Sequence, residues 1–131
     1  MDTLSNDITT LRCHIERWPI AGSFRISRGA KTEAIVVVAE ISRSGHTGRG
    51  ECVPYARYGE TPEGVLAAIL GVQKSLAAGL DRRSLASAMP AGAARNALDC
   101  ALCDLEAKCG GQRIWTLLNR PAPSPRSTAY T

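Results

Sequence analysis

Aromatic residues are scarce in this sequence. Phe, Trp and Tyr together make up 5% of the 131 residues. Proteins that bind single-stranded nucleic acid usually place several aromatic rings among basic residues, so that bases can stack on them. Here the 16 Lys and Arg residues are scattered along the chain and exceed Asp and Glu by a net charge of +4. We therefore expect no nucleic-acid partner.

Long hydrophobic runs are also missing. The longest unbroken apolar run, Ala34–Ala39, is far shorter than the roughly 20 residues that cross a bilayer. The N-terminal stretch MDTLSNDITTLRCHIERW has no basic segment followed by an apolar one, as a secretory signal would. These features predict a cytoplasmic protein without a membrane partner.

The five cysteines do not suggest a disulfide framework, because their number is odd and no signal peptide precedes them. Cys100 and Cys103 form a C-x-x-C pair, but it lies inside ARNALDCALCDLEAK, an expected helix interior with no second pair and no His nearby. A zinc or redox site would need such partners. We expect the pair to be buried small side chains and keep a redox domain as a weaker alternative.

The first part of the chain has the pattern of a small antiparallel sheet. Apolar and polar residues alternate over Ile8–Trp18, Thr32–Ser42 is rich in β-branched residues, and Gly50–Val53 supplies a short third strand. SRSGHTGRG, between the second and third strands, predicts a hairpin turn. We expect Pro19–Lys31, which is broken by Pro, Gly and Ser, to be a loop.

The second part predicts helices. Thr61-Pro62-Glu63 has the form of a helix start, and apolar residues at helical spacing extend that helix to about Ala78. Asp81 begins a second, short helix. A third runs from Pro90 to Cys109, and its small residues predict close packing against a neighbouring element. Ile114–Leu118 adds one apolar turn.

The sequence therefore predicts an α+β fold, a three-stranded antiparallel meander followed by a helical subdomain. Residues 121–127, PAPSPRS, resemble a linker, and STAYT (Ser127–Thr131) resembles the start of a strand. We expect residues 1–120 to form the α+β domain, with residues 121–131 leading into another part of a longer protein.

Three segments together resemble one family. They are ERWPIAGSFRISRG, GRGECVPYARYGETPE and PAGAARNALDCALCDLEAKCGGQRIWTLL. They are similar to the N-terminal capping domain of dipeptide epimerases, the L-Ala-D/L-Glu epimerase group of the enolase superfamily, whose wider relatives include mandelate racemase and muconate lactonizing enzyme. One departure is Cys103, where the family usually has Trp.

This resemblance implies a cap over a (β/α) barrel. Residues 121–131 would be the linker and the start of the first barrel strand, and the rest of the barrel is missing here. In such enzymes two barrel lysines exchange the α-proton of a dipeptide, and three barrel carboxylates hold Mg²⁺. Since a barrel of this kind takes about 200 residues or more, the chain has no expected catalytic or metal residues and should be inactive alone. The implied partners are the barrel and the dipeptide, and a homo-oligomer with a second copy of the chain stays open.

Alternatives to a dipeptide epimerase cap stay open. One is the cap of a sister enzyme, such as an N-acylamino acid racemase, muconate cycloisomerase or o-succinylbenzoate synthase. Another is a stand-alone interaction module with the same fold, which would expose the small-residue helix to a partner.

The resemblance also implies where substrate is contacted. Two cap loops, Pro19–Lys31 and Pro54–Glu60, close over the barrel mouth, and a dipeptide ending in Glu would attract a loop cation. We rank Lys31 first, then Arg28 and Arg25, with solvated loop charges as the alternative.

Other residues complete the expected contacts. Tyr58, with Tyr55, could line the mouth of the active site or pin the loop to the sheet, and Thr131 matches a substrate-contacting position of the family. Glu51 and Glu60 have no base or metal partner at a fixed spacing, so we expect no catalysis from them. The carboxylate of Glu60 would instead be stabilised by the helix that follows it.

Overall fold

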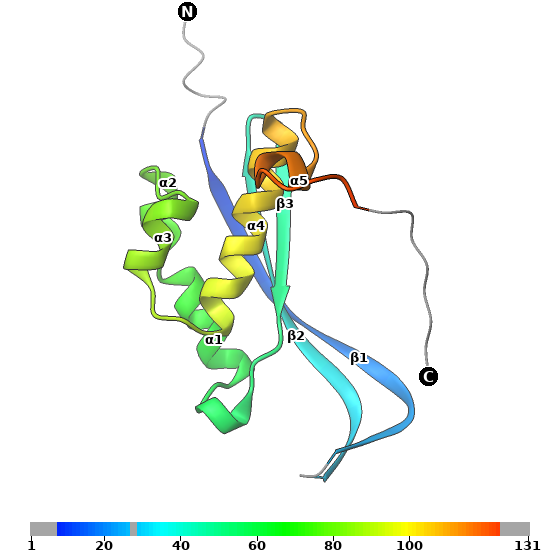
Figure 1. The fold of residues 1–131 in the computed structure, drawn as a ribbon. Coiled ribbons are helices and arrows are strands. Elements are labelled where there is room, and N and C mark those ends of the chain that lie inside the picture. The colour runs from blue at the N-terminus through cyan, green and yellow to red at the C-terminus, as the bar shows by residue number, and fades with distance from the viewer. Residues whose placement is uncertain (1–7, 27–28, 124–131) are drawn as a thin grey trace, which may run out of the picture.

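The computed structural model describes residues 8–26 and 29–123. Three antiparallel strands form one sheet in the order β1-β2-β3: β1 is Thr10–Ile26, β2 is Gly29–Arg43 and β3 is His46–Cys52 (Figure 1). The turn between β2 and β3 has positive φ at both Ser44 (55°) and Gly45 (78°), which suits the right-handed twist of a tight hairpin. The expected meander is confirmed.

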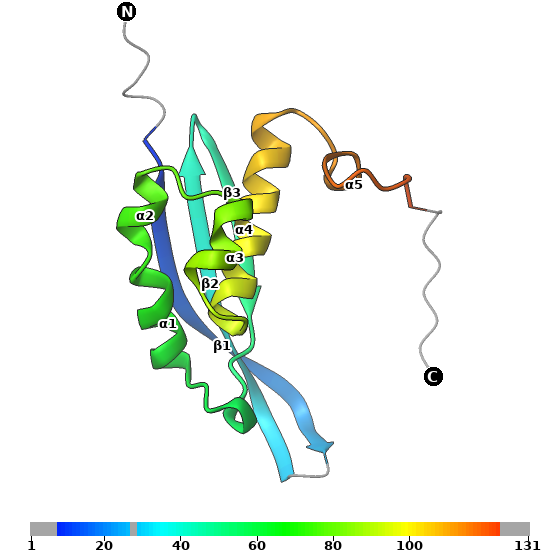
Figure 2. The ribbon, with the colours of Figure 1, turned by 60° about the vertical axis from the view of Figure 1, so that its left-hand side comes forward.

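The segment Pro19–Lys31 was expected to be a loop, but its described residues, 19–26 and 29–31, are instead the two strands of a ribbon. Strands β1 and β2 continue their pairing to Phe24 with Lys31 and Ile26 with Gly29, after a register shift between Pro19 and Phe24. Because the irregularity is confined to that bulge on an edge strand, Pro and Gly can be accommodated without ending the sheet. The ribbon extends well beyond the helices (Figures 1 and 2).

Five helices follow the sheet, and none in the described part of the chain is long and apolar enough to cross a membrane. They are α1 (Pro62–Leu70), α2 (Gln73–Ala77), α3 (Arg82–Ala88), α4 (Ala93–Cys109) and α5 (Ile114–Leu117). Helices α1, α2 and α4 pack on the sheet, while α3 and α5 pack against α4 (Figure 2).

The helix expected over Thr61–Ala78 is broken. Helix α1 ends at Leu70 with Gly71 as its C-cap, and α2 begins at Gln73. Gly inside a helix costs about 1 kcal/mol relative to Ala, so a break is cheap there. Ile69 and Leu76, on either side of the break, are both buried in the core.

Alternate residues of β2 form the floor of the core. Val37, Ala39 and Ile41 are fully buried and belong to one cluster with apolar residues from the helices. Val36 and Val38 belong to the opposite face and are buried as well. That face also carries polar side chains, among which His14 Nε2 lies 2.7 Å from Glu16 Oε2. The core cluster shared with the helices includes neither valine, so the helices cover the face of Val37.

Two glycines allow α4 to approach β3 very closely. A Cβ atom at Gly48 would lie 2.7 Å from Leu105 Cβ, and one at Gly50 would lie 2.7 Å from the Ala101 nitrogen. Both would also overlap carbonyl oxygens of α4. The expectation that the small residues of this helix serve close packing is confirmed, since Ala97 and Ala101 are fully buried there.

Candidate functional site

The ribbon and the loop that follows β3 form a groove of about 510 Å³. It lies past the N-terminal end of α1, on the face of the sheet that the helices cover further along. Its walls are mainly apolar, with Ile20 and Ile35 from the ribbon and Val53 and Pro54 from the loop. Its charged lining residues are Lys31, Glu33 and Glu60.

Lys31, which lines this groove, also contacts the aromatic ring of Tyr55. Its Nζ is 6.0 Å from the centroid of the Tyr55 ring, the outer limit of a cation–π interaction. The ring centroids of Tyr55 and Tyr58 are 5.4 Å apart and their planes are inclined by 42°. The two segments expected to carry substrate contacts are therefore side by side, joined through these three side chains.

The charge of Lys31 is available for binding. Glu33 pairs with Arg17, whose Nη1 lies 3.2 Å from Glu33 Oε2, and both oxygens of Glu60 accept hydrogen bonds from backbone N–H groups. Within residues 8–26 and 29–123, no carboxylate forms an ion pair with Lys31. An anionic ligand would thus meet an ammonium without a direct ion pair, beside an apolar wall and the carboxylate of Glu60.

Glu60 connects the loop with the longest helix. Its Oε1 accepts from the Tyr55 N–H at 2.9 Å, and its Oε2 accepts from the Ala93 N–H at 2.8 Å. Ala93 is the first residue of α4, whose N-cap Gly92 has no side chain to offer.

The carboxylate of Glu60 was expected to be stabilised by the helix that follows it. That helix, α1, is instead capped by the Thr61 side chain. Sequence reasoning missed the role of Glu60 because Ala93 is 33 positions away.

The other predicted contact residues are more dispersed. Tyr58 is 75% exposed, and Arg25 is exposed on β1. In the register of the ribbon, Lys31 pairs with position 24 and Arg25 with position 30. Because successive strand residues alternate between faces, Arg25 lies on the face opposite Lys31. Arg28 and Thr131 lie outside the described residues, so their contacts remain predictions.

Cys100 and Cys103 were expected to be buried, and this prediction is wrong. Cys100 is exposed and Cys103 is half-buried, because the core-facing positions of α4 are taken by Ala97, Leu98 and Ala101. Partial burial raises the pKa of both thiols, the opposite of what an activated thiol needs. Within the described part of the chain, no group of three or more His, Cys, Asp or Glu could hold a metal ion.

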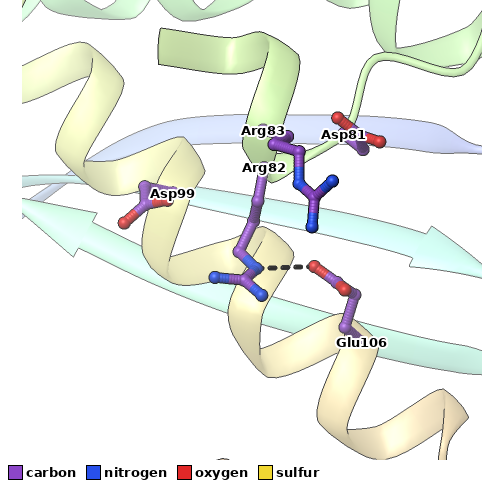
Figure 3. A pocket seen from close by; sticks show the side chains of 5 residues that line it. All are labelled: Asp81, Arg82, Arg83, Asp99 and Glu106. Atoms are coloured by element: carbon purple, nitrogen blue, oxygen red, sulfur yellow. Dashed lines mark hydrogen bonds and ion pairs between the residues drawn. The ribbon is translucent and has the colours of Figure 1, made fainter. Parts of the chain in front are cut away.

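A second depression, of about 430 Å³, lies between α3 and α4 (Figure 3). It is lined by Asp81, Arg82, Arg83, Asp99 and Glu106. The Arg82 Nε donates to Glu106 Oε2 at 2.7 Å. Since acidic and basic groups face one another here, the cluster serves to join the two helices.

The profile of the family described as mandelate racemase / muconate lactonizing enzyme, N-terminal domain, matches residues 8–119. The chain belongs to this family. The family fold agrees with the three-stranded sheet and helices described above, so the expected class of capping domain is confirmed.

Several members of the family are closely similar to this domain. L-Ala-D/L-Glu epimerase of Escherichia coli K12 is 46% identical over 122 residues, which are 93% of this chain and 38% of that protein. N-acetyl-D-glutamate racemase of a Pseudoalteromonas species is 37% identical over 87 residues, covering 65% of this chain and 28% of that protein.

Solved structures agree. An Agrobacterium tumefaciens enolase family member, homologous to dipeptide epimerases and bound to sodium and L-Ala-L-Glu, has a TM-score of 0.83 at 52% identity, over 87% of this chain and 35% of that one. Dipeptide epimerase from Methylococcus capsulatus, complexed with Mg and L-Arg-D-Lys, has a TM-score of 0.74 at 32% identity, over 87% of this chain and 35% of that one. This capping domain thus spans between 28% and 38% of the length of these four relatives.

Proposed function

We propose that this chain is the capping domain of a dipeptide epimerase and that Lys31 binds a carboxylate of the dipeptide. The observation that carries the proposal is the groove that Lys31 lines together with an apolar wall, where its ammonium also lies 6.0 Å from the centroid of the Tyr55 ring. Support comes from the 46% identity to an L-Ala-D/L-Glu epimerase and the 52% identity to a structure that holds L-Ala-L-Glu.

Lys31 suits a substrate with an acidic side chain. An ammonium donates charge-assisted hydrogen bonds to a carboxylate and adapts to its position as a flexible point charge. Such a bond contributes about 1.5–3 kcal/mol, so its loss should weaken binding about 10- to 100-fold. The apolar wall beside Lys31 can accept the methylene groups that carry the carboxylate.

The chemistry of epimerisation has to come from elsewhere. An α-proton next to a carboxylate is weakly acidic, so its removal needs a positioned base and a cation that neutralises the developing charge. The described residues do not fit Mg²⁺, because they include no cluster of carboxylates that could hold it. We assign to this chain the binding and the exclusion of water, and no proton-transfer step.

The proposal can be tested in a chimera. In it, this chain replaces the matching 122-residue segment of the E. coli epimerase, and the exchange of the α-proton in D₂O is followed for L-Ala-L-Glu and for N-acetylglutamate. We expect exchange with the dipeptide. A folded chimera that exchanges only N-acetylglutamate would assign the domain to an N-acylamino acid racemase instead.

A further inference from the structure

The turn at the tip of the loop between β3 and α1 is not held in place by hydrophobic burial. This single turn of 3-10 helix, η2 (Ala56–Tyr58), contains no buried residue. The turn closes on itself, with Tyr58 N–H donating to the Tyr55 carbonyl at 3.0 Å and Gly59 N–H donating to the Ala56 carbonyl at 2.9 Å. These bonds shape the turn, but they do not fix where it lies on the domain.

Glu60 fixes the position of this loop through hydrogen bonds. It makes two of them to the backbone of Tyr55: its Oε1 accepts from the Tyr55 N–H, and its own N–H donates to the Tyr55 carbonyl at 3.3 Å. Its second oxygen binds the Ala93 N–H at the start of α4. Gly92 leaves room for this oxygen, because a Cβ there would lie 3.1 Å from it.

The anchor at the other end of this connection is rigid. Helix α4 is 17 residues long and has six buried residues, and its backbone touches β3 at the two glycines. A carboxylate at its N-terminus is also favoured by the helix dipole. The side chain of Glu60 therefore ties the backbone of Tyr55 to the start of α4, a helix with six buried residues.

Tyr55 in turn carries the aromatic ring that faces Lys31. A free lysine side chain samples many rotamers, and ordering it when a ligand binds costs conformational entropy. A ring held 6.0 Å from the ammonium restricts those rotamers before the ligand arrives. We propose that Glu60 is a positioning residue. It holds the Tyr55 ring against Lys31 and so restricts the rotamers of the lysine side chain before a ligand binds.

The structural part of this inference can be tested in the chain itself by NMR. The Hε protons of Lys31 should be shifted upfield by the Tyr55 ring current, and Tyr55→Leu should abolish the shift while leaving the bonds of Glu60 in place. Glu60→Gln removes the negative charge and leaves one of the two N–H groups without its acceptor. We expect this variant to lose most of the same shift.

The matched control is Glu63→Gln, the same substitution at an exposed carboxylate three positions further on. It should leave the Lys31 resonances as they are in the unsubstituted chain. If Glu60→Gln also leaves them unchanged, or if Tyr55→Leu does, the positioning role is overturned.

The functional part rests on the proposed function and is read in the chimera. Glu60→Gln should raise the KM for L-Ala-L-Glu about two- to fivefold, the range of an exposed cation–π contact, with kcat changed by less than about twofold. In a Lys31→Met background the same substitution should have no further effect on KM, because the side chain that it positions is gone.

The two proposals fail in different ways. A folded chimera that does not act on L-Ala-L-Glu would contradict the proposed function, whereas the Lys31 resonances would still decide the positioning role. An active chimera in which Glu60→Gln lowers kcat equally with and without Lys31 would make Glu60 a purely structural residue and overturn the inference.

Discussion

At the scale of single residues, two carboxylates are fixed by backbone N–H groups at helix N-termini. Glu60 bridges to α4, and Asp81 caps α3, where its Oδ1 accepts from the Ser84 N–H at 2.9 Å and the Ser84 hydroxyl reaches back to the Asp81 N–H. The capped start expected at Asp81 is confirmed. In each case the carboxylate fills a position that the helix leaves without a partner.

The cap of α3 should make stability depend on pH. The hydrogen bonds from Ser84 hold the pKa of Asp81 below its ordinary value. The unfolded chain then takes up the proton first, so the stabilisation is complete above the ordinary pKa and is lost as the pH falls through the lowered one. Asp81→Ala should destabilise the chain most near neutral pH, and the difference should shrink below about pH 4. Urea unfolding of both proteins at pH 7 and pH 3 measures it; equal differences at the two pH values would contradict the assignment.

Four of the five thiols should react slowly or not at all, because their pKa is raised. Burial raises the pKa of Cys13 and of Cys52 to about 11, and partial burial raises the pKa of Cys100 and Cys103. In the native chain at pH 7 we expect iodoacetamide to label the exposed Cys100 slowly and to leave Cys13 and Cys52 unlabelled until denaturant is added. Peptide mass spectrometry resolves the sites. Rapid labelling of Cys100 and Cys103 at this pH would revive the redox alternative.

At the scale of elements, the contact between α4 and β3 dominates the domain. Gly50→Ala would place a methyl group against the backbone of Ala97 and Ala101, neither of which can move independently of its helix. We expect this substitution to lower the free energy of unfolding by about 3 kcal/mol, the upper part of the range for overpacking. Thermal and urea unfolding measure the loss.

The control is Gly71→Ala, at the end of α1. Its new Cβ would have neighbours no closer than 3.4 Å, and the residue already has right-handed helical dihedral angles. This variant should be as stable as the unsubstituted chain or more stable, by up to about 1 kcal/mol. A similar loss in both variants would show that the close approach of α4 to β3 is not the cause.

Sequence patterns predicted those elements whose information is local. The β-branched run of β2, the capped start of α3 and the small residues of α4 each carry their own signal within a few positions. The ribbon has no such local signal, because its pairing across Pro19–Lys31 depends on a bulge that shifts the register. The bridge from Glu60 to Ala93 has none either, since these two distant segments meet only in the folded chain.

The groove was predicted in part, and through resemblance. Lys31 was ranked first among the contact residues and lies in the groove, but its contact with Tyr55 has no signature in the sequence. The sequence did not show that Arg25 and Lys31 lie on opposite faces of the ribbon, because that follows only from the strand register. Whether any of them touches substrate stays a prediction.

At the scale of the whole molecule, the chain matches only part of the enzymes that it resembles. It covers 38% of the E. coli epimerase, and its described residues include no cluster suited to a metal. We predict that the chain alone does not exchange the α-proton of L-Ala-L-Glu in D₂O with Mg²⁺ present. Proton NMR of the dipeptide over a day checks this; exchange well above the rate without protein would contradict the division of roles.

The most direct test of the account compares two dipeptides that differ only in charge. In the chimera, kcat/KM is measured for L-Ala-L-Glu and for the neutral L-Ala-L-Gln, with Lys31 intact and with Lys31→Met. We predict that the intact chain prefers L-Ala-L-Glu and that Lys31→Met removes about 10- to 100-fold of that preference, with little change for L-Ala-L-Gln. A preference that survives Lys31→Met unchanged would contradict the claim that this groove recognises the acidic substrate.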